Sequence, residues 1–104
     1  MHKENGGNFW IAIENEEVIG TISLENLGDK KGLLKSLYVA REYRNRRIAS
    51  NLMDILLNFA KEKGYKTLEL DTYGKFHIAI KFYEKIGFVK KEQIGEKQIY
   101  EKEI

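Results

Sequence analysis

The 104-residue sequence contains no cysteine, which excludes disulfide bonds, thiolate metal ligands and a cysteine nucleophile. It contains only two histidines, which cannot form a metal site by themselves. No apolar run approaches the roughly 20 residues that a membrane-spanning helix needs, and residues 1–5 lack the apolar core of a signal peptide. We therefore expect a cytoplasmic protein with no membrane contact and no metal cofactor.

A strong excess of charge is also missing, because the net charge is only +2. The global electrostatics therefore do not favour a nucleic-acid partner. Hydrophobic residues make up 42% and charged residues 33% of the chain, a balance typical of a folded domain. The length suits a single domain spanning residues 1–104. Any anion-binding role must then depend on a local feature.

Hydrophobic patterns predict an antiparallel meander in the first half of the chain. Residues 9–13, 18–24 and 33–39 are predicted as strands, separated by polar turns at 14–17 and 27–32. Gly20 lies inside the second strand, where a glycine indicates a bulge or the close approach of another segment.

The pattern then changes to a helical period. Apolar residues recur at helical spacing over residues 48–60, and Gly64 is a typical helix stop. A strand at 67–72, a helix at about 76–86 and two strands at 88–93 and 98–103 follow. This order predicts an α/β (α+β) fold, a mixed, largely antiparallel six-stranded sheet with two packed helices. We expect the core to contain Ile11, Ile13, Ile22, Leu24, Leu37, Val39, Leu52, Ile55, Leu56, Phe59, Leu68, Leu70, Ile80 and Phe88.

The turn at residues 44–50 joins a predicted strand to a helix N-terminus. Backbone N–H groups lack partners there, and the helix dipole attracts anions. The turn has no glycine and carries Arg44, Arg46 and Arg47, although arginine is electrostatically unfavourable at a helix N-terminus. Broken local rules of this kind tend to mark function. From the turn alone, a phosphate cradle, a nucleic-acid-binding patch and a solvated surface cluster all stay open.

Motifs in the second half resemble those of the GNAT superfamily of acyl-CoA-dependent N-acetyltransferases. The family runs from an apolar strand into Q/R-x-x-G-x-G/A at a helix start, then through a strand to a helix with A-x-x-F/L-Y-E-K-x-G-F. The chain has LYV at 37–39, YRNRRIA at 43–49, LEL at 68–70 and AIKFYEKIGF at 79–88. The last motif is highly specific, and the resemblance covers the chain from Phe9 onward.

The resemblance implies that acetyl-CoA is a co-substrate and that amides of the turn hold its pyrophosphate. Arg44 aligns with the Q/R position and Ala49 with the last small position. Arg47 replaces the first glycine, so either its guanidinium pairs with a phosphate or the site has decayed. The implied cofactor-binding residues are Leu37, Tyr38, Val39, Arg44, Asn45, Arg46, Arg47, Ile48, Ala49, Ser50, Phe76, Ala79, Phe82 and Tyr83.

The resemblance also implies that Tyr83 is the general acid near the sulfur of CoA. The general base is open, because the glutamate that family members often carry on the strand before the turn is missing here. Glu25 on the preceding strand is a candidate, and a water relay or an amine that arrives neutral are the alternatives. Phe76 replaces a family asparagine, and His77 beside it either touches the cofactor arm or faces solvent.

Family members normally begin with a strand and two helices before the first hairpin, whereas this sequence begins at the hairpin. We expect Phe9 and Trp10 to be uncovered and a homodimer to bury them, unless the chain is a fragment.

The implied activity is acetyl transfer from acetyl-CoA, by direct attack, to a primary amine of a small molecule, peptide or protein. The alternatives are a silent module that binds CoA or a protein partner, and a nucleic-acid binder that uses the arginine turn.

Overall fold

In the computed structural model, which describes residues 7–104, six strands form one sheet and two α-helices pack against it. The predicted fold class is therefore confirmed. The elements in chain order are β1 (Asn8–Glu14), β2 (Glu17–Gly28), β3 (Lys31–Val39), α1 (Ile48–Glu62), β4 (Thr67–Tyr73), α2 (His77–Lys85), β5 (Val89–Ile94) and β6 (Lys97–Glu103), with a short 3₁₀ turn η1 (Arg41–Tyr43) before α1.

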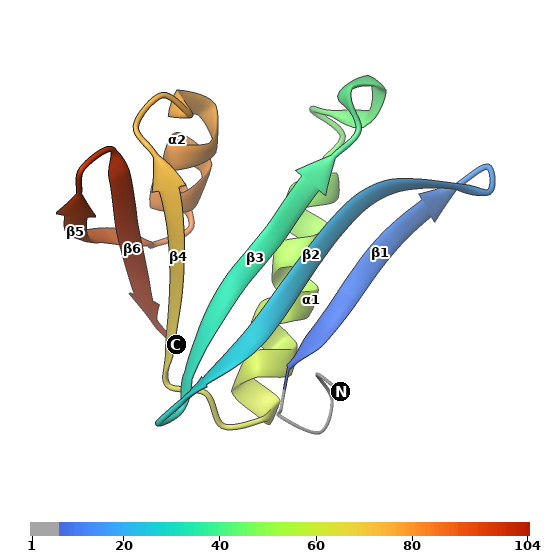
Figure 1. Ribbon diagram of the computed structural model, residues 1–104. Helices are drawn as coiled ribbons and strands as arrows, with labels where there is room; N and C mark the ends of the chain where they lie inside the picture. The colour runs from blue at the N-terminus through green and yellow to red at the C-terminus, as the bar shows by residue number, and fades with distance from the viewer. Residues whose placement is uncertain (1–6) are drawn as a thin grey trace.

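The sheet order is β1-β2-β3-β4-β6-β5, and only the β3–β4 pair is parallel. The first three strands form the expected antiparallel meander. Figure 1 shows the sheet dividing like a V between β3 and β4, with α1 behind the β1–β3 arm and α2 beside the β4–β6–β5 arm. Neither helix is long and apolar enough to cross a membrane.

A single core cluster joins the sheet to both helices. Leu52, Met53 and Leu56 of α1 pack against Ile22 and Leu24 of β2, and the cluster continues into β4 and α2. Because these residues belong to one cluster, both helices cover the same sheet face. Most of the expected core is confirmed by burial of Ile22, Leu24, Leu52, Leu56, Leu68, Leu70 and Phe88 and by packing of Leu37, Phe59 and Ile80 against them.

Three expected core residues were wrong, since Ile11, Ile13 and Ile55 are 47%, 60% and 47% exposed. Val39 is half-buried and lies outside the core cluster. Successive side chains of a strand point to opposite faces, and β1 turns Trp10 rather than its isoleucines towards α1. The Trp10 ring meets Phe59 edge-on, with centroids 5.1 Å apart. Trp10 is thus half-buried rather than uncovered, whereas Phe9 is exposed as expected.

Gly20 is a close-approach point, as its sequence context indicated. A Cβ atom on Gly20 would lie 3.1 Å from both Leu52 Cδ1 and the Tyr38 carbonyl oxygen, and 3.2 Å from Ile48 Cγ2. The missing side chain lets β2 lie directly against the first turns of α1. The turn expected at 27–32 is shorter in the structure, because β2 and β3 are linked only by Asp29 and Lys30, both at positive φ.

The V between β3 and β4 opens because their pairing is brief. Only residues 31–33 of β3 pair with residues 67–69 of β4. Beyond them, β3 carries a bulge at Ser36, whose φ is 60°. The hydroxyls of Thr21 and Ser23 donate hydrogen bonds to the carbonyl oxygens of Ser36 and Lys35, which hold the bulge against β2. A bulge bends its strand, so the end of β3 turns away from β4.

Candidate functional site

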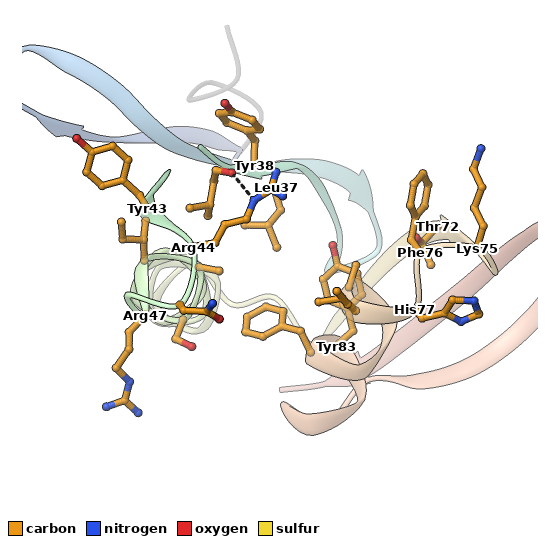
Figure 2. A pocket seen from close by; sticks show the side chains of 18 residues that line it. Leu37, Tyr38, Tyr43, Arg44, Arg47, Thr72, Lys75, Phe76, His77 and Tyr83 are labelled. Atoms are coloured by element: carbon orange, nitrogen blue, oxygen red, sulfur yellow. Dashed lines mark hydrogen bonds between the residues drawn. The ribbon is translucent and has the colours of Figure 1, made fainter. Parts of the chain in front are cut away.

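A cavity of about 940 Å³ lies where β3 and β4 have separated. The end of β3, the turn before α1, the first turn of α1, the segment after β4 and α2 all contribute to its wall (Figure 2). All the cofactor contacts expected from the sequence line this cavity, with the exception of Arg46. They are Leu37, Tyr38, Val39, Arg44, Asn45, Arg47, Ile48, Ala49, Ser50, Phe76, Ala79, Phe82 and Tyr83.

The N-terminus of α1 presents unpaired donors to the cavity. The first hydrogen bond within the helix runs from the Asn51 N–H to the Arg47 carbonyl, at 3.0 Å. The N–H groups of Ile48, Ala49 and Ser50 therefore have no acceptor inside the helix, and no side chain among residues 7–104 caps them. With the positive end of the helix dipole, these donors make a site suited to a phosphate group.

The turn keeps a glycine-like backbone without a glycine. Arg47 is the N-cap of α1 with φ 63° and ψ 17°, and Asn45 has φ 67°. Both lie in the left-handed region that glycine adopts most readily. Glycine would therefore suit position 47 for two reasons, because it adopts a positive φ readily and because it has no side chain.

The three arginines of the turn have different surroundings. Arg44 lines the cavity, and its Nε donates a hydrogen bond to the Val39 carbonyl at 3.0 Å (Figure 2). Arg47 is exposed, and Figure 2 shows its side chain extending outward from the start of α1. Arg46 makes an ion pair with Glu14, 3.1 Å from Nη2 to Oε1, and so does not line the cavity.

Tyr83 contributes a hydroxyl from α2 to the middle of the cavity wall. Its residue is only 9% exposed, and its ring packs between Phe82 and Phe88. Figure 2 shows the ring between α2 and the end of β3. Burial raises the pKa of Tyr83 above its ordinary value, because the protein interior disfavours the phenolate. The hydroxyl therefore stays protonated and able to donate at neutral pH.

Glu25 lies apart from this group. It faces Leu33 across the β2–β3 ladder and pairs with Lys35, 3.2 Å from Nζ to Oε1. It does not line the cavity. Its role as a base stays a prediction that the geometry does not favour.

Several lining residues escaped sequence reasoning. They are Thr72, Tyr43, Lys75 and Ile78. His77, for which the sequence left contact with the cofactor arm and exposure to solvent open, is both exposed and at the cavity wall. Thr72 had a detectable signal, because it follows Leu68 and Leu70 at alternate positions and so falls on the buried face of β4. The others occupy loops or a helix start, where no periodicity predicts a direction.

Comparisons with known proteins agree on one family. The model of the acetyltransferase (GNAT) family matches residues 1–88. A probable N-acetyltransferase camello from Xenopus laevis is 36% identical over 84 residues, which are 79% of this chain and 38% of that protein. The chain thus spans well under half the length of this curated relative.

Solved structures of acetyltransferases share the fold. A GNAT-family acetyltransferase from Staphylococcus aureus superposes with a TM-score of 0.90 at 30% identity, over 98% of this chain and 70% of that one. The PaiA N-acetyltransferase from Thermoplasma acidophilum, in complex with coenzyme A, gives a TM-score of 0.89 at 28% identity. That match covers 94% of this chain and 61% of the other.

Proposed function

Because the chain belongs to the acetyltransferase (GNAT) family, we propose that it transfers the acetyl group of acetyl-CoA to a primary amine. The observation that carries the proposal is the cavity itself, which joins a helix N-terminus, an unpaired strand edge and a protonated tyrosine. The acceptor is a small molecule or an amine of a peptide or protein.

The pyrophosphate of acetyl-CoA fits the start of α1. Free N–H groups of Ile48, Ala49 and Ser50 supply hydrogen bonds to phosphate oxygens, and they do so without any side chain. Arg47 adds a positive charge beside them from an exposed position. The opposite wall is formed by apolar side chains of α2, such as Phe82 and Ala79, which suit the pantetheine arm.

The edge of β3 that faces β4 can bind the pantetheine arm of acetyl-CoA. Leu37, Tyr38 and Val39 lie beyond the last β3–β4 pair, and Tyr38 and Val39 are paired with β2 on their other side. Their peptide groups that face the space between β3 and β4 are therefore available to hydrogen-bond the amides of a ligand that lies along the strand, as in strand addition. The same backbone holds the thioester carbonyl near Tyr83.

Tyr83 donates a proton in the chemical step. The amine nitrogen forms a bond to the acetyl carbon while the carbon–sulfur bond breaks, and the Tyr83 hydroxyl protonates the departing sulfur. The proton lost by the attacking amine balances the one that Tyr83 later regains from solvent. Glu25 is paired with Lys35 outside the cavity, so we assign removal of the proton from the acceptor to water. An amine that arrives neutral needs no base before it attacks and releases its proton to water afterwards.

The decisive experiment combines a titration with acetyl-CoA and a rate assay on a panel of amines. Saturable binding and turnover support the proposal, whereas binding without turnover on any amine identifies a silent module. Tyr83→Phe should reduce kcat by about 10²-fold or more, the lower range for a general acid, with little change in the Kd for acetyl-CoA. An unchanged kcat would remove the acid role from Tyr83.

The nucleic-acid alternative has lost most of its basis. Of the three arginines in the turn, Arg46 is paired with Glu14 and Arg44 is bonded to Val39. Arg47 alone among them makes no hydrogen bond or ion pair within the part of the chain that the structure describes. A nucleic-acid binder would show a steep dependence of affinity on salt and no affinity for CoA.

We also propose that a second copy of this chain covers the outer face of β1. Phe9, Ile11 and Ile13 project from that face beside Val18, each about half exposed, and β1 is an edge strand of the described sheet. Ile11→Asp should shift sedimentation from dimer to monomer. Ile94→Asp, at an equally exposed apolar residue of β5, should not. A wild-type chain that sediments as a monomer at high micromolar concentration would contradict the homodimer.

A further inference from the structure

The turn before α1 has an unfavourable backbone that something else must stabilise. Two residues with side chains, Asn45 and Arg47, lie in the left-handed region with φ of 67° and 63°. Such conformations are unfavourable for residues with a side chain, although less so for asparagine than for most. They persist where surrounding contacts determine the backbone. The contacts must therefore be found outside the turn itself.

Arg46, which lies between these two residues, makes two hydrogen bonds to a residue outside the turn. Its Nη2 and Nη1 lie 3.1 Å and 3.3 Å from Oε1 and Oε2 of Glu14, a fork of two parallel hydrogen bonds. Its guanidinium carbon lies 4.9 Å from the centre of the Tyr43 ring. Glu14 ends β1, so the fork ties the turn to the β1–β2 hairpin across 32 positions of sequence.

We propose that the Glu14–Arg46 fork is a positioning device that replaces the missing glycine of the phosphate-binding turn. Glu14 never lines the cavity, yet it holds Arg46 and so keeps Asn45 and Arg47 in the conformation that directs the α1 amides at a phosphate. This proposal rests on the proposed binding of acetyl-CoA. It removes Arg46 from the direct contacts that the sequence resemblance implied and gives it a structural partner.

A positioning role for the fork and direct phosphate binding by Arg46 predict opposite effects of Glu14→Gln on the affinity for acetyl-CoA. If Arg46 were held in reserve for a phosphate, Glu14→Gln would release it and tighten binding of acetyl-CoA. If the fork positions the turn, Glu14→Gln lowers the fraction of molecules with a competent turn and weakens binding in proportion. We expect the Kd to rise about two- to fivefold, the upper range for an exposed ion pair with good geometry.

Glu16→Gln is the matched control. Glu16 belongs to the same hairpin and is exposed, and it makes no ion pair in the described part of the chain. Its substitution removes the same charge near the site without touching the fork. The Kd for acetyl-CoA should then stay unchanged or fall slightly, because one negative charge is lost.

Two further readouts distinguish positioning from general destabilisation. Glu14→Gln should raise the KM for acetyl-CoA and leave kcat nearly unchanged, because bound ligand itself orders the turn. In an Arg47→Gly background, where the charge of Arg47 is absent from both proteins compared, Glu14→Gln should change the Kd much less than it does with Arg47 present, since glycine adopts positive φ without support. If Glu14→Gln binds as tightly as the wild type, or if it weakens binding equally with Arg47 and with glycine at position 47, the proposal is wrong.

Limited trypsin digestion tests the fork without any ligand. The turn contains arginines 44, 46 and 47, and Glu14→Gln leaves those cleavage sites intact. A loosened turn should be cut there about two- to fivefold faster than in the wild type or in Glu16→Gln. If acetyl-CoA does not bind the wild type but cleavage accelerates, the proposed function fails and the fork stands. If acetyl-CoA binds and neither readout changes, the function stands and the fork is refuted.

Discussion

Replacing Arg47 by alanine and, separately, by glycine distinguishes the effect of its guanidinium from the effect of its backbone conformation. Both variants lose the side-chain charge, so their difference in stability reports the φ of 63° together with the greater freedom of glycine in the unfolded chain. A left-handed conformation lowers the stability of a residue with a side chain by about 1–2 kcal/mol. Glycine avoids this loss, but its greater freedom in the unfolded chain lowers stability by about 0.5–1 kcal/mol. Arg47→Gly should therefore be more stable than Arg47→Ala by about 0.5–1 kcal/mol.

Thermal unfolding measures this difference. For a domain of this size, 1 kcal/mol corresponds to about 4–8 °C in Tm, so the glycine variant should melt roughly 2–8 °C higher. Asn58 is the control, because it is exposed in the middle of α1. There the order should reverse, with alanine more stable than glycine by about 1 kcal/mol. Equal stability of the two Arg47 variants, with the normal order at Asn58, would refute the left-handed backbone at Arg47.

The same two variants show whether the guanidinium of Arg47 strengthens or obstructs the binding of acetyl-CoA. If it grips a phosphate, Arg47→Ala should weaken binding by less than about 1.5 kcal/mol, because the group is exposed, and added salt should shrink the loss. If it obstructs, both variants should bind more tightly than the wild type. We expect the grip, since Figure 2 shows the side chain extending outward rather than filling the cavity.

Gly20→Ala should lower stability by about 1–3 kcal/mol, because the new Cβ would lie 3.1 Å from the Tyr38 carbonyl oxygen and from Leu52 Cδ1; an unchanged urea midpoint would contradict the close approach of β2 and α1. Glu69→Gln should lower stability at neutral pH by an amount that disappears in acid. Burial raises the pKa of Glu69, but hydrogen bonds from Lys91 and Lys31 outweigh it and leave the pKa below its ordinary value. The stabilisation is therefore present above about pH 4.5 and is lost as the pH falls through the lowered pKa. Unfolding measured from pH 7 to pH 3 should show the two proteins converging, and a constant difference would argue against the charged pairing.

Much of the fold could be predicted from alternation and helical spacing. The strand positions and both helices followed from these periods, with boundaries within a few residues, and Gly64 ended α1 as expected. The periods did not show which face of β1 meets α1, so Ile11 and Ile13 were assigned to the wrong side. The prediction that Ile55 is buried was wrong for a related reason, since the buried face of α1 contains Met53 instead.

The residues that line the cavity could be predicted from sequence motifs more than from hydrophobic periodicity. The FYEKIGF run marked Tyr83, and the segment from Tyr43 to Ala49 marked the turn before α1, because local residue order alone carries these motifs. Thr72 and Lys75 were missed, because their approach to the cavity depends on how far β4 lies from β3.

The sequence by itself determined the six strands, the two helices and the strand–turn–helix passage that offers unpaired amides to an anion. It did so because each of these depends on neighbours within one or two turns of chain. Only the tertiary structure decided that β3 and β4 separate after three paired positions and that Arg47 adopts a positive φ. It also decided that Arg46 turns from the cavity to Glu14, 32 positions away. Those outcomes depend on contacts between distant segments, whose energies no local pattern records.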